Sequence, residues 1–318
     1  MKMPDKALEH LVELCADTAD LPAPDRAVAA ATDIRGRFGD AVAGVLFYGS
    51  CLRAGDDDGK ILDFYILVDG YRAAYGRFIP ALWNHIVPPN VFYAETPAPG
   101  GVIRSKYGVI SLAQFERLSR AAGDVIVWAR FSQPTRLLWS REEQARDRIH
   151  RALATAVMTM VGAVAALMPE TFSAHEIWQT AFARTYHAEL RSERSGRPSD
   201  LFTRDADHYR ALTAPALHAA GYPVNGPDPA GLYRLAVSKQ ACRRAKLMWT
   251  WRQVSGKILS LARLVTAGFT FAGGADYLAW KIARHSGVKL HLTPWQRRHP
   301  VAAGLILFWR LWRQGAFR

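Results

Sequence analysis

The chain has 318 residues, half of them apolar, and a formal net charge of +13 at pH 7. This length and apolar content predict folded domains with a sizeable core and exclude a disordered or fibrous protein. The three cysteines have no paired spacing, which excludes a disulfide framework and a zinc site, and no apolar signal segment follows the first residues, so a reducing cytoplasm is expected.

Residues 1–140 are predicted to form a small α/β domain with a mixed sheet. Two helices open it, at 4–18 and 24–38, and Pro22 and Pro24 separate them. The following expected elements are strands at 42–48 and 61–69, a helix near 73–86, strands at 90–95 and 102–109, a helix at 112–122 with Ser111 as its N-cap, and a further segment at 125–139.

Residues 141–231 are predicted to form an all-helical domain. Its helices are expected at 142–167, 174–191 and 205–220. The stretch 152–168 carries no charge over 17 residues, but this is shorter than the roughly 20 residues that cross a bilayer. A buried helix is therefore expected there.

Residues 232–318 are predicted to be a basic, Trp-rich tail that is helical in pieces. From 239 to 318 there are 15 Lys and Arg residues against one acid, and six of the ten tryptophans. Cations interleaved with Trp suit an anionic membrane surface, and single-stranded nucleic acid is the alternative. The apolar run 301–309 is too short to span and suggests an interfacial anchor. The expected anchoring residues are Trp295, Arg297, Arg298, Trp309, Arg310, Trp312 and Arg313.

Two apolar runs with a Gly-Ser turn between them are the most informative feature of the chain. Tyr48, Gly49 and Ser50 end the first run, where glycine lets backbone amides approach a triphosphate and the serine can hydrogen-bond it. Asp63 lies within the second run, where a carboxylate is costly unless it has a function, such as holding Mg²⁺. Lys106 ends another strand and could meet phosphate oxygens. The pattern predicts a nucleotidyltransferase site.

The second metal ligand is not obvious from the sequence. Nucleotidyltransferases of this class commonly carry two acids at i and i+2 of one strand, but the i+2 residue here is Tyr65. Asp69 is on the same face but roughly 20 Å away at strand rise. The candidates are the acids at 56–58, Glu95, and an acid from the helical domain.

Several motifs occur in the order seen in one family. They are Tyr48-Gly49-Ser50, Lys60 with Asp63-Phe64 and Val68-Asp69, Lys106-Tyr107-Gly108-Val109-Ile110-Ser111, Met168-Pro169-Glu170-Thr171-Phe172-Ser173, and Leu264-Val265-Thr266-Ala267-Gly268. From about residue 40 to 285 the sequence resembles the phosphatidate cytidylyltransferases of the mitochondrial translocator assembly and maintenance type. The resemblance implies a nucleotidyltransferase domain, a helical winged-helix-like domain and a basic C-terminal region that touches the membrane.

The resemblance also implies a reaction. CTP and phosphatidate would give CDP-diacylglycerol and pyrophosphate with Mg²⁺, for anionic phospholipid synthesis, by a protein attached peripherally to the cytoplasmic face of the inner membrane, with no nucleic-acid partner. An anionic phosphate is already a nucleophile, so positioning and charge neutralisation would supply the catalysis. The alternatives are a nucleotidyltransferase with an RNA, protein or sugar phosphate acceptor, and an inactive membrane-bound scaffold.

Individual positions take roles from the same resemblance. Tyr48, Gly49 and Ser50 match the nucleotide-binding turn, Asp63 the metal carboxylate, and Lys106 with Tyr107 the phosphate-facing strand end. The segment at 186–191 matches a family segment with an aspartate where Glu189 stands, which makes Glu189 the candidate for the second catalytic and metal-binding acid. Cys51 stands where the family usually has a glycine.

Overall fold

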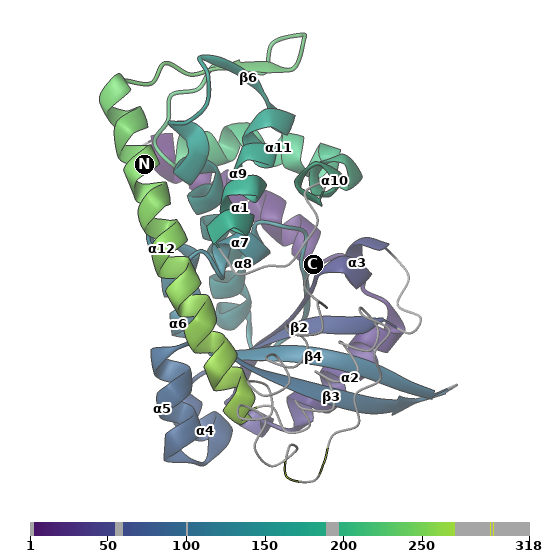
Figure 1. Cartoon of the computed structure of the whole chain (residues 1–318). Coiled ribbons are helices and arrows are strands. Elements are labelled where there is room, and N and C mark those ends of the chain that lie inside the picture. The colour runs from purple at the N-terminus through teal and green to yellow at the C-terminus, as the bar shows by residue number, and fades with distance from the viewer. Residues whose placement is uncertain are drawn as a thin grey trace.

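The computed structural model describes residues 3–54, 60–99, 101–188, 197–270, 293 and 295 (Figure 1). The helices are α1 (Met3–Ala19), α2 (Asp25–Gly36), α3 (Ser50–Ala54), α4 (Tyr71–Tyr75), α5 (Phe78–Ile86), α6 (Leu112–Ser119), α7 (Trp128–Phe131), α8 (Glu143–Ala165), α9 (Ala174–Ala188), α10 (Arg197–Arg204), α11 (Ala206–Ala219) and α12 (Lys239–Thr270), with a 3-10 turn at Gly39–Ala41. The strands are β1 (Val42–Tyr48), β2 (Ile61–Val68), β3 (Asn90–Ala98), β4 (Gly101–Ser111), β5 (Arg136–Ser140), β6 (Thr171–Ser173) and β7 (Leu232–Arg234).

Five strands form one mixed sheet in the order β3-β4-β2-β1-β5. Strands β2 and β4 are parallel, whereas β1 is antiparallel to both β2 and β5, and β3 is antiparallel to β4. The sheet and its covering helices confirm the predicted α/β character. The parallel pair is the decisive feature, because it brings the second and fourth strands side by side at the centre of the sheet.

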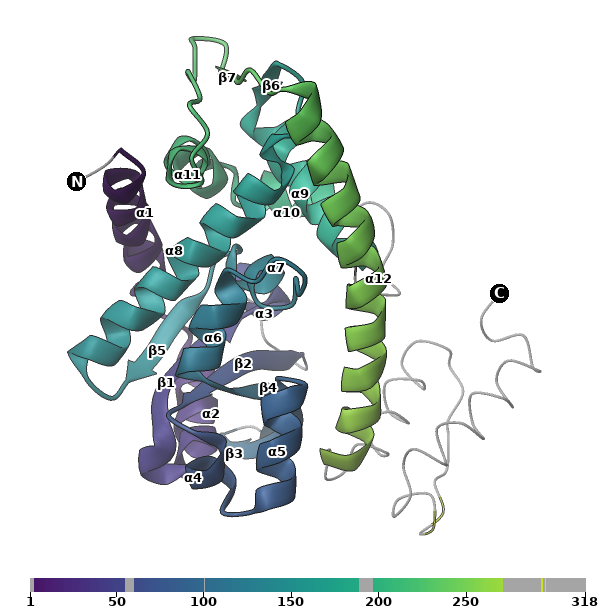
Figure 2. The same ribbon diagram turned by 90° about the vertical axis from the view of Figure 1, so that its left-hand side faces the viewer.

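The two faces of the sheet bury different clusters of side chains. Successive residues of a strand point to opposite faces, so Phe47, Phe64 and Val109 pack on one side, against α2. Leu46 and Tyr65 pack on the other side, where α6, α7 and α8 supply the partners (Figure 2). Both central strands are therefore apolar almost throughout, which is why a charged residue within them is informative.

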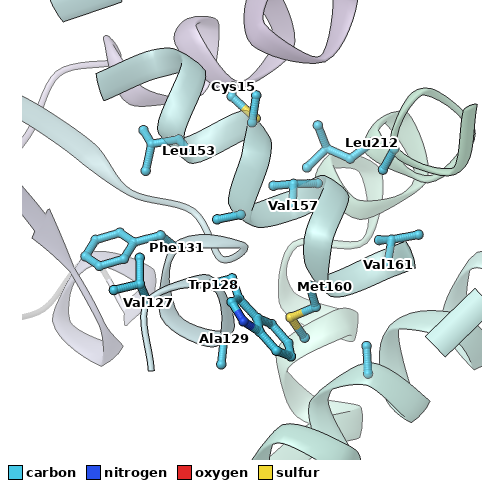
Figure 3. Packing of buried hydrophobic residues seen from close by; sticks show 14 of the residues in the cluster. Cys15, Val127, Trp128, Ala129, Phe131, Leu153, Val157, Met160, Val161 and Leu212 are labelled. Atoms are coloured by element: carbon cyan, nitrogen blue, oxygen red, sulfur yellow. The ribbon is translucent and has the colours of Figure 1, made fainter. Parts of the chain in front are cut away.

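A single core continues from the face of the sheet that α6, α7 and α8 cover into the helical part of the molecule. Cys15 of α1, Trp128 of α7 and Met160 of α8 belong to the same buried cluster as Leu212 of α11 (Figure 3). The uncharged stretch at 152–168 is largely α8, and most of its side chains are buried, as expected. None of the helices within the described ranges is long and apolar enough to cross a membrane.

The prediction of an all-helical domain is wrong in one respect. Strands β6 and β7 pair as a two-stranded antiparallel sheet. Phe172 of β6 stacks on Tyr233 of β7, which buries both rings. Ser173 and Glu176 then form a reciprocal capping box at the start of α9: the Ser173 hydroxyl accepts from the Glu176 amide at 3.2 Å, and the Glu176 carboxylate accepts from the Ser173 amide at 2.7 Å. This segment therefore stabilises the start of α9.

Helix α12 runs alongside both parts of the molecule (Figures 1 and 2). Its buried side includes Trp249, which donates to the Ala163 carbonyl at 2.9 Å, and Arg252, which lies over that indole ring and donates to the Ala122 carbonyl. Further along, Arg263 pairs with Asp124 and donates to the Pro88 carbonyl at 2.8 Å. The helix thus ties the helical part to the loop before β3.

Three expected elements differ in the structure. The helix near 73–86 is two helices, because Gly76 adopts a left-handed φ of +61° and ends α4. The segment at 125–139 contains the short helix α7 and then β5, a strand that the sequence pattern did not predict because its apolar and polar residues do not alternate. Helix α6 ends at Ser119 rather than 122, since the backbone leaves the helix at Arg120.

Candidate functional site

Four of the strands present one row of side chains on the face of the sheet that α6, α7 and α8 cover. Tyr48 is the register partner of Asp63, Asp63 is the partner of Lys106, and Lys106 is the partner of Tyr93. All four side chains are half-buried, whereas the next row, which includes Tyr65, is buried under the helices. The row of Tyr48, Asp63, Lys106 and Tyr93, called the polar row below, therefore lies where the covering helices end.

Asp63 and Lys106 form the charged centre of the polar row. The ammonium of Lys106 lies 4.0 Å from a carboxylate oxygen of Asp63, and the side chains are 40 % and 28 % exposed, respectively. The parallel register of β2 and β4 alone brings these two residues together, since 43 positions separate them in sequence. A carboxylate and a cation side by side at a partly exposed edge complement a metal-bound triphosphate, because the carboxylate can bind the metal ion and the cation can bind phosphate oxygens.

Gly49 brings the backbone of the turn directly against Asp63. Its φ is +97°, a conformation that only glycine adopts readily, and a Cβ at this position would lie 3.0 Å from a carboxylate oxygen of Asp63. Ser50 follows as the first residue of α3 and is exposed. The structure thus brings together four predicted residues, Tyr48, Gly49, Asp63 and Lys106, with Ser50 beside them.

Tyr107, expected beside the phosphates, lies on the opposite face of the sheet. Neighbouring residues of a strand alternate, so Lys106 and Tyr107 cannot both face the polar row. The Tyr107 ring is buried, stacks on Phe92 and packs edge-on against Phe38. Burial raises the pKa of its hydroxyl, and the nearby Arg37 partly offsets this. Tyr107 is a core residue of the other face.

Tyr65 occupies the position where a second acid was sought. Its ring is buried and packs edge-on against Phe131 and Tyr48. A Cβ at Gly108 would lie 3.3 Å from both this ring and Pro89, so the close packing of both residues favours glycine in the Lys-Tyr-Gly motif. Tyr65, two residues after Asp63 on β2, is therefore a core residue and not a metal ligand.

Glu95 shares the face of the polar row but is occupied elsewhere. It accepts a hydrogen bond from the Tyr93 hydroxyl at 2.7 Å and lies 3.6 Å from Arg104. It also stands on β3, two strands or about 10 Å from β2 at the usual strand spacing. Glu95 therefore does not share an ion with Asp63 in this arrangement.

Tyr93, at the end of the polar row, and Arg104, two residues before Lys106 on the same face, are not among the residues predicted from the sequence. Burial and the bond to Glu95 raise the pKa of Tyr93 to about 12, so its hydroxyl stays protonated and can donate. The sequence does place Tyr93 and Glu95 two residues apart, and Arg104 and Lys106 likewise, so each pair lies on one face of its strand. This arrangement was not recognised since the register that aligns the two strands was unknown.

The remaining predicted ligands lie outside the described residues. The candidate metal ligands among them are Glu189 and the acids at 56–58. The predicted membrane-anchoring residues Arg297, Arg298, Trp309, Arg310, Trp312 and Arg313 also lie outside the described ranges. Trp295 is described and is half exposed. Within the ranges that the structure covers, no group of three His, Cys, Asp or Glu side chains is placed to hold a metal ion. Cys51 is buried and donates to the Ile61 carbonyl at 3.3 Å, which links α3 to β2.

Comparison with known proteins adds no family to this description. No protein-family model matches the chain, and no curated protein matches its sequence. The polar row and the motifs within the chain are therefore the features that bear on its function.

Proposed function

We propose that the chain is a Mg²⁺-dependent nucleotidyltransferase. The observation that carries this proposal is the close approach of the Gly49 turn to the Asp63 carboxylate, where a Cβ on Gly49 would lie 3.0 Å from a carboxylate oxygen, with Lys106 as the next residue along the row. Within that class, the reaction we propose is that of CTP with phosphatidate to give CDP-diacylglycerol and pyrophosphate. The order of the Lys-Tyr-Gly-Val and Pro-Glu-Thr-Phe-Ser motifs and the basic Trp-rich tail support this choice of acceptor.

The residues of the polar row fit a Mg²⁺–triphosphate complex. Mg²⁺ usually takes one or two carboxylates and fills its other positions with water and phosphate oxygens, and the partly exposed Asp63 carboxylate suits this role. When bound there, the ion would neutralise charge on the triphosphate. Lys106 would neutralise further phosphate charge, and the backbone amides beside Gly49 would be close enough to bind a phosphate oxygen because no side chain intervenes.

The proposed chemistry needs no general base. An anionic phosphate oxygen of phosphatidate attacks the α-phosphorus of CTP, the bond from that phosphorus to the bridging oxygen breaks, and pyrophosphate leaves with the electron pair. Catalysis would come from holding the two anions in line and neutralising them. Asp63 and Lys106 are the residues to which we assign these tasks, with Glu189 as the proposed second acid.

We further propose that residues 141–231 act as a winged-helix-like domain and 232–318 as a peripheral membrane anchor. The antiparallel pairing of β6 with β7 beside α9 and α11 supports the first assignment, because a winged-helix domain combines a small sheet with a helical core. The two strands are joined through α9, α10 and α11, and β7 (Leu232–Arg234) lies just past the predicted boundary at 231. The balance of 15 basic residues to one acid beyond position 238 supports the second. The location we propose is the cytoplasmic face of the inner membrane.

Conversion of labelled CTP by the purified protein tests the proposal. The wild type with Mg²⁺ and phosphatidate vesicles should form CDP-diacylglycerol, and Asp63→Asn should not. Asp69→Asn is the matched control, because Asp69 ends the same strand but pairs with Arg141 away from the row. Bound CTP without lipid product would indicate another acceptor, and the absence of CTP binding would indicate an inactive scaffold.

A further inference from the structure

The outer face of α5 is unusually apolar for an exposed surface. Five large side chains project from this nine-residue helix into solvent, namely Phe78, Ile79, Leu82, Trp83 and Ile86. Two of them are about two-thirds exposed, Phe78 at 65 % and Ile79 at 67 %. Single exposed apolar residues are ordinary, but a contiguous group marks an interaction surface. These five residues are called the α5 face below.

The inner side of α5 is held firmly, so the α5 face is not a consequence of loose packing. Asn84 is completely buried, donates to the Val109 carbonyl of β4 at 2.9 Å, and its side-chain oxygen accepts from the Asn90 amide. Gln114 of α6 donates to the His85 carbonyl at 2.9 Å. The helix is thus fixed with its apolar side outward.

The chain segment that carries the α5 face has basic residues and no acid. Between Asp69 and Glu95 the chain contains no acid, whereas Arg72 on α4 and Arg77 just before α5 are exposed. Helix α12 contains seven Lys or Arg residues and no acid, and its C-terminal half lies beside α5 in Figures 1 and 2. That half holds Arg263, which is paired with Asp124, and the exposed Lys257. A surface of this kind complements an anionic partner.

Helix α12 repeats the same pattern on its own outer side. Leu247, Trp251, Val254 and Ile258 recur every three or four residues and are exposed, opposite the packed side that holds Trp249 and Arg252. The exposed Lys246 and Lys257 flank this stripe. Apolar and Trp side chains bordered by lysines are typical of helices that lie in a membrane interface, where the chains enter the acyl boundary and the ammonium groups reach phosphates.

We propose that the α5 face, with the outer stripe of α12, docks the folded body of the protein on an anionic lipid bilayer. This deepens the proposed function, since it rests on a lipid acceptor and places the bilayer close to the polar row. Asn84, on the inner side of α5, bonds to Val109, which is three residues or about 10 Å along β4 from Lys106, and the α5 face lies across the helix about 10 Å further out. Docking through this face would hold the polar row within about 20 Å of the bilayer surface.

Co-sedimentation of the full-length protein with vesicles is the primary test. The wild type should bind vesicles containing phosphatidylglycerol far more strongly than phosphatidylcholine vesicles. Ile79→Glu with Trp83→Glu should lower the partition coefficient on the anionic vesicles at least about tenfold. Leu21→Glu with Val28→Glu is the matched control, because these exposed apolar residues lie outside the α5 face, Leu21 between α1 and α2 and Val28 on α2, and should leave partitioning unchanged. Equal partitioning of the two double variants would overturn the proposal.

A fluorescent reporter tests the same contact without adding charge. Cys15 and Cys51 are buried, so a Cys242→Ser background allows selective labelling of Ile79→Cys with a polarity-sensitive dye. Its emission should shift to the blue on phosphatidylglycerol vesicles, and that of labelled Leu21→Cys should not. No shift at position 79 would overturn the proposal, as would sedimentation showing that the α5 face joins two copies of the chain.

The two proposals fail in different experiments. Vesicle binding is measured without CTP, and CTP binding is measured without vesicles. Loss of partitioning in Ile79→Glu with Trp83→Glu, at unchanged Mg²⁺–CTP affinity, supports docking whatever the acceptor is. A wild type that docks but forms no CDP-diacylglycerol would refute the proposed reaction and leave the docking surface established.

Discussion

Replacing Gly49 by alanine should have two separable effects, a loss of stability from backbone strain and a loss of Mg²⁺–CTP affinity. Gly49→Ala would place a methyl group 3.0 Å from a carboxylate oxygen of Asp63 while holding φ near +97°. Such a backbone conformation costs a non-glycine residue about 1–3 kcal/mol. At about 2–4 °C per kcal/mol for a domain of this size, the melting temperature should fall by several degrees.

The same substitution should weaken nucleotide binding, because the carboxylate of Asp63 must move to make room. The carboxylate must move by a few tenths of an ångström, less than the full ångström that costs on the order of a hundredfold, so a loss of about 10-fold in Mg²⁺–CTP affinity is expected. Isothermal titration with Mg²⁺–CTP and thermal denaturation measure the two effects separately.

Gly76→Ala provides the matched control for strain. Gly76 has a left-handed φ of +61°, but a Cβ there would meet nothing within 4 Å. Gly76→Ala should therefore lower the melting temperature to a similar degree and leave Mg²⁺–CTP affinity unchanged. The reasoning is refuted if Gly49→Ala binds Mg²⁺–CTP like the wild type, or if Gly76→Ala loses as much affinity.

Two further predictions concern stability. Ser173→Ala removes one half of the capping box at α9 and should lower the free energy of unfolding by about 1 kcal/mol in urea denaturation. CTP binding should be unchanged. A selective loss of CTP binding would instead give this motif a role in the site. Burial, and to a lesser degree Arg136, lowers the pKa of His208 from 6.5 to about 4. The unfolded chain therefore binds more protons between pH 6.5 and 4, so stability should fall as the pH falls through that window, by up to about 1.4 kcal/mol per pH unit. His208→Gln should reduce this slope, and urea midpoints at pH 7 and pH 5 would contradict the assignment if both proteins changed equally.

Local pattern was sufficient for most of the α/β part. The strand expected at 42–48 is β1 with the same limits, and the strand expected at 61–69 is β2 to within one residue. Both are continuous apolar runs because both faces of the central strands are covered. Strand β5 was not predicted, since it is an edge strand that pairs only with β1 and carries no alternating pattern of its own.

The sequence by itself determined that the turn at Gly49 and the carboxylate at Asp63 are exceptional, because glycine and a charge within apolar runs need a reason that local structure does not supply. Strand alternation alone also separates Lys106 from Tyr107, although the motif suggested that they act together. Tertiary structure alone decided that Asp63 meets Lys106, that Tyr65 serves the core, and that Glu95 is held by Tyr93 and Arg104. The physical reason is that register between strands distant in sequence follows from how both faces of the sheet are buried, and no local pattern encodes it.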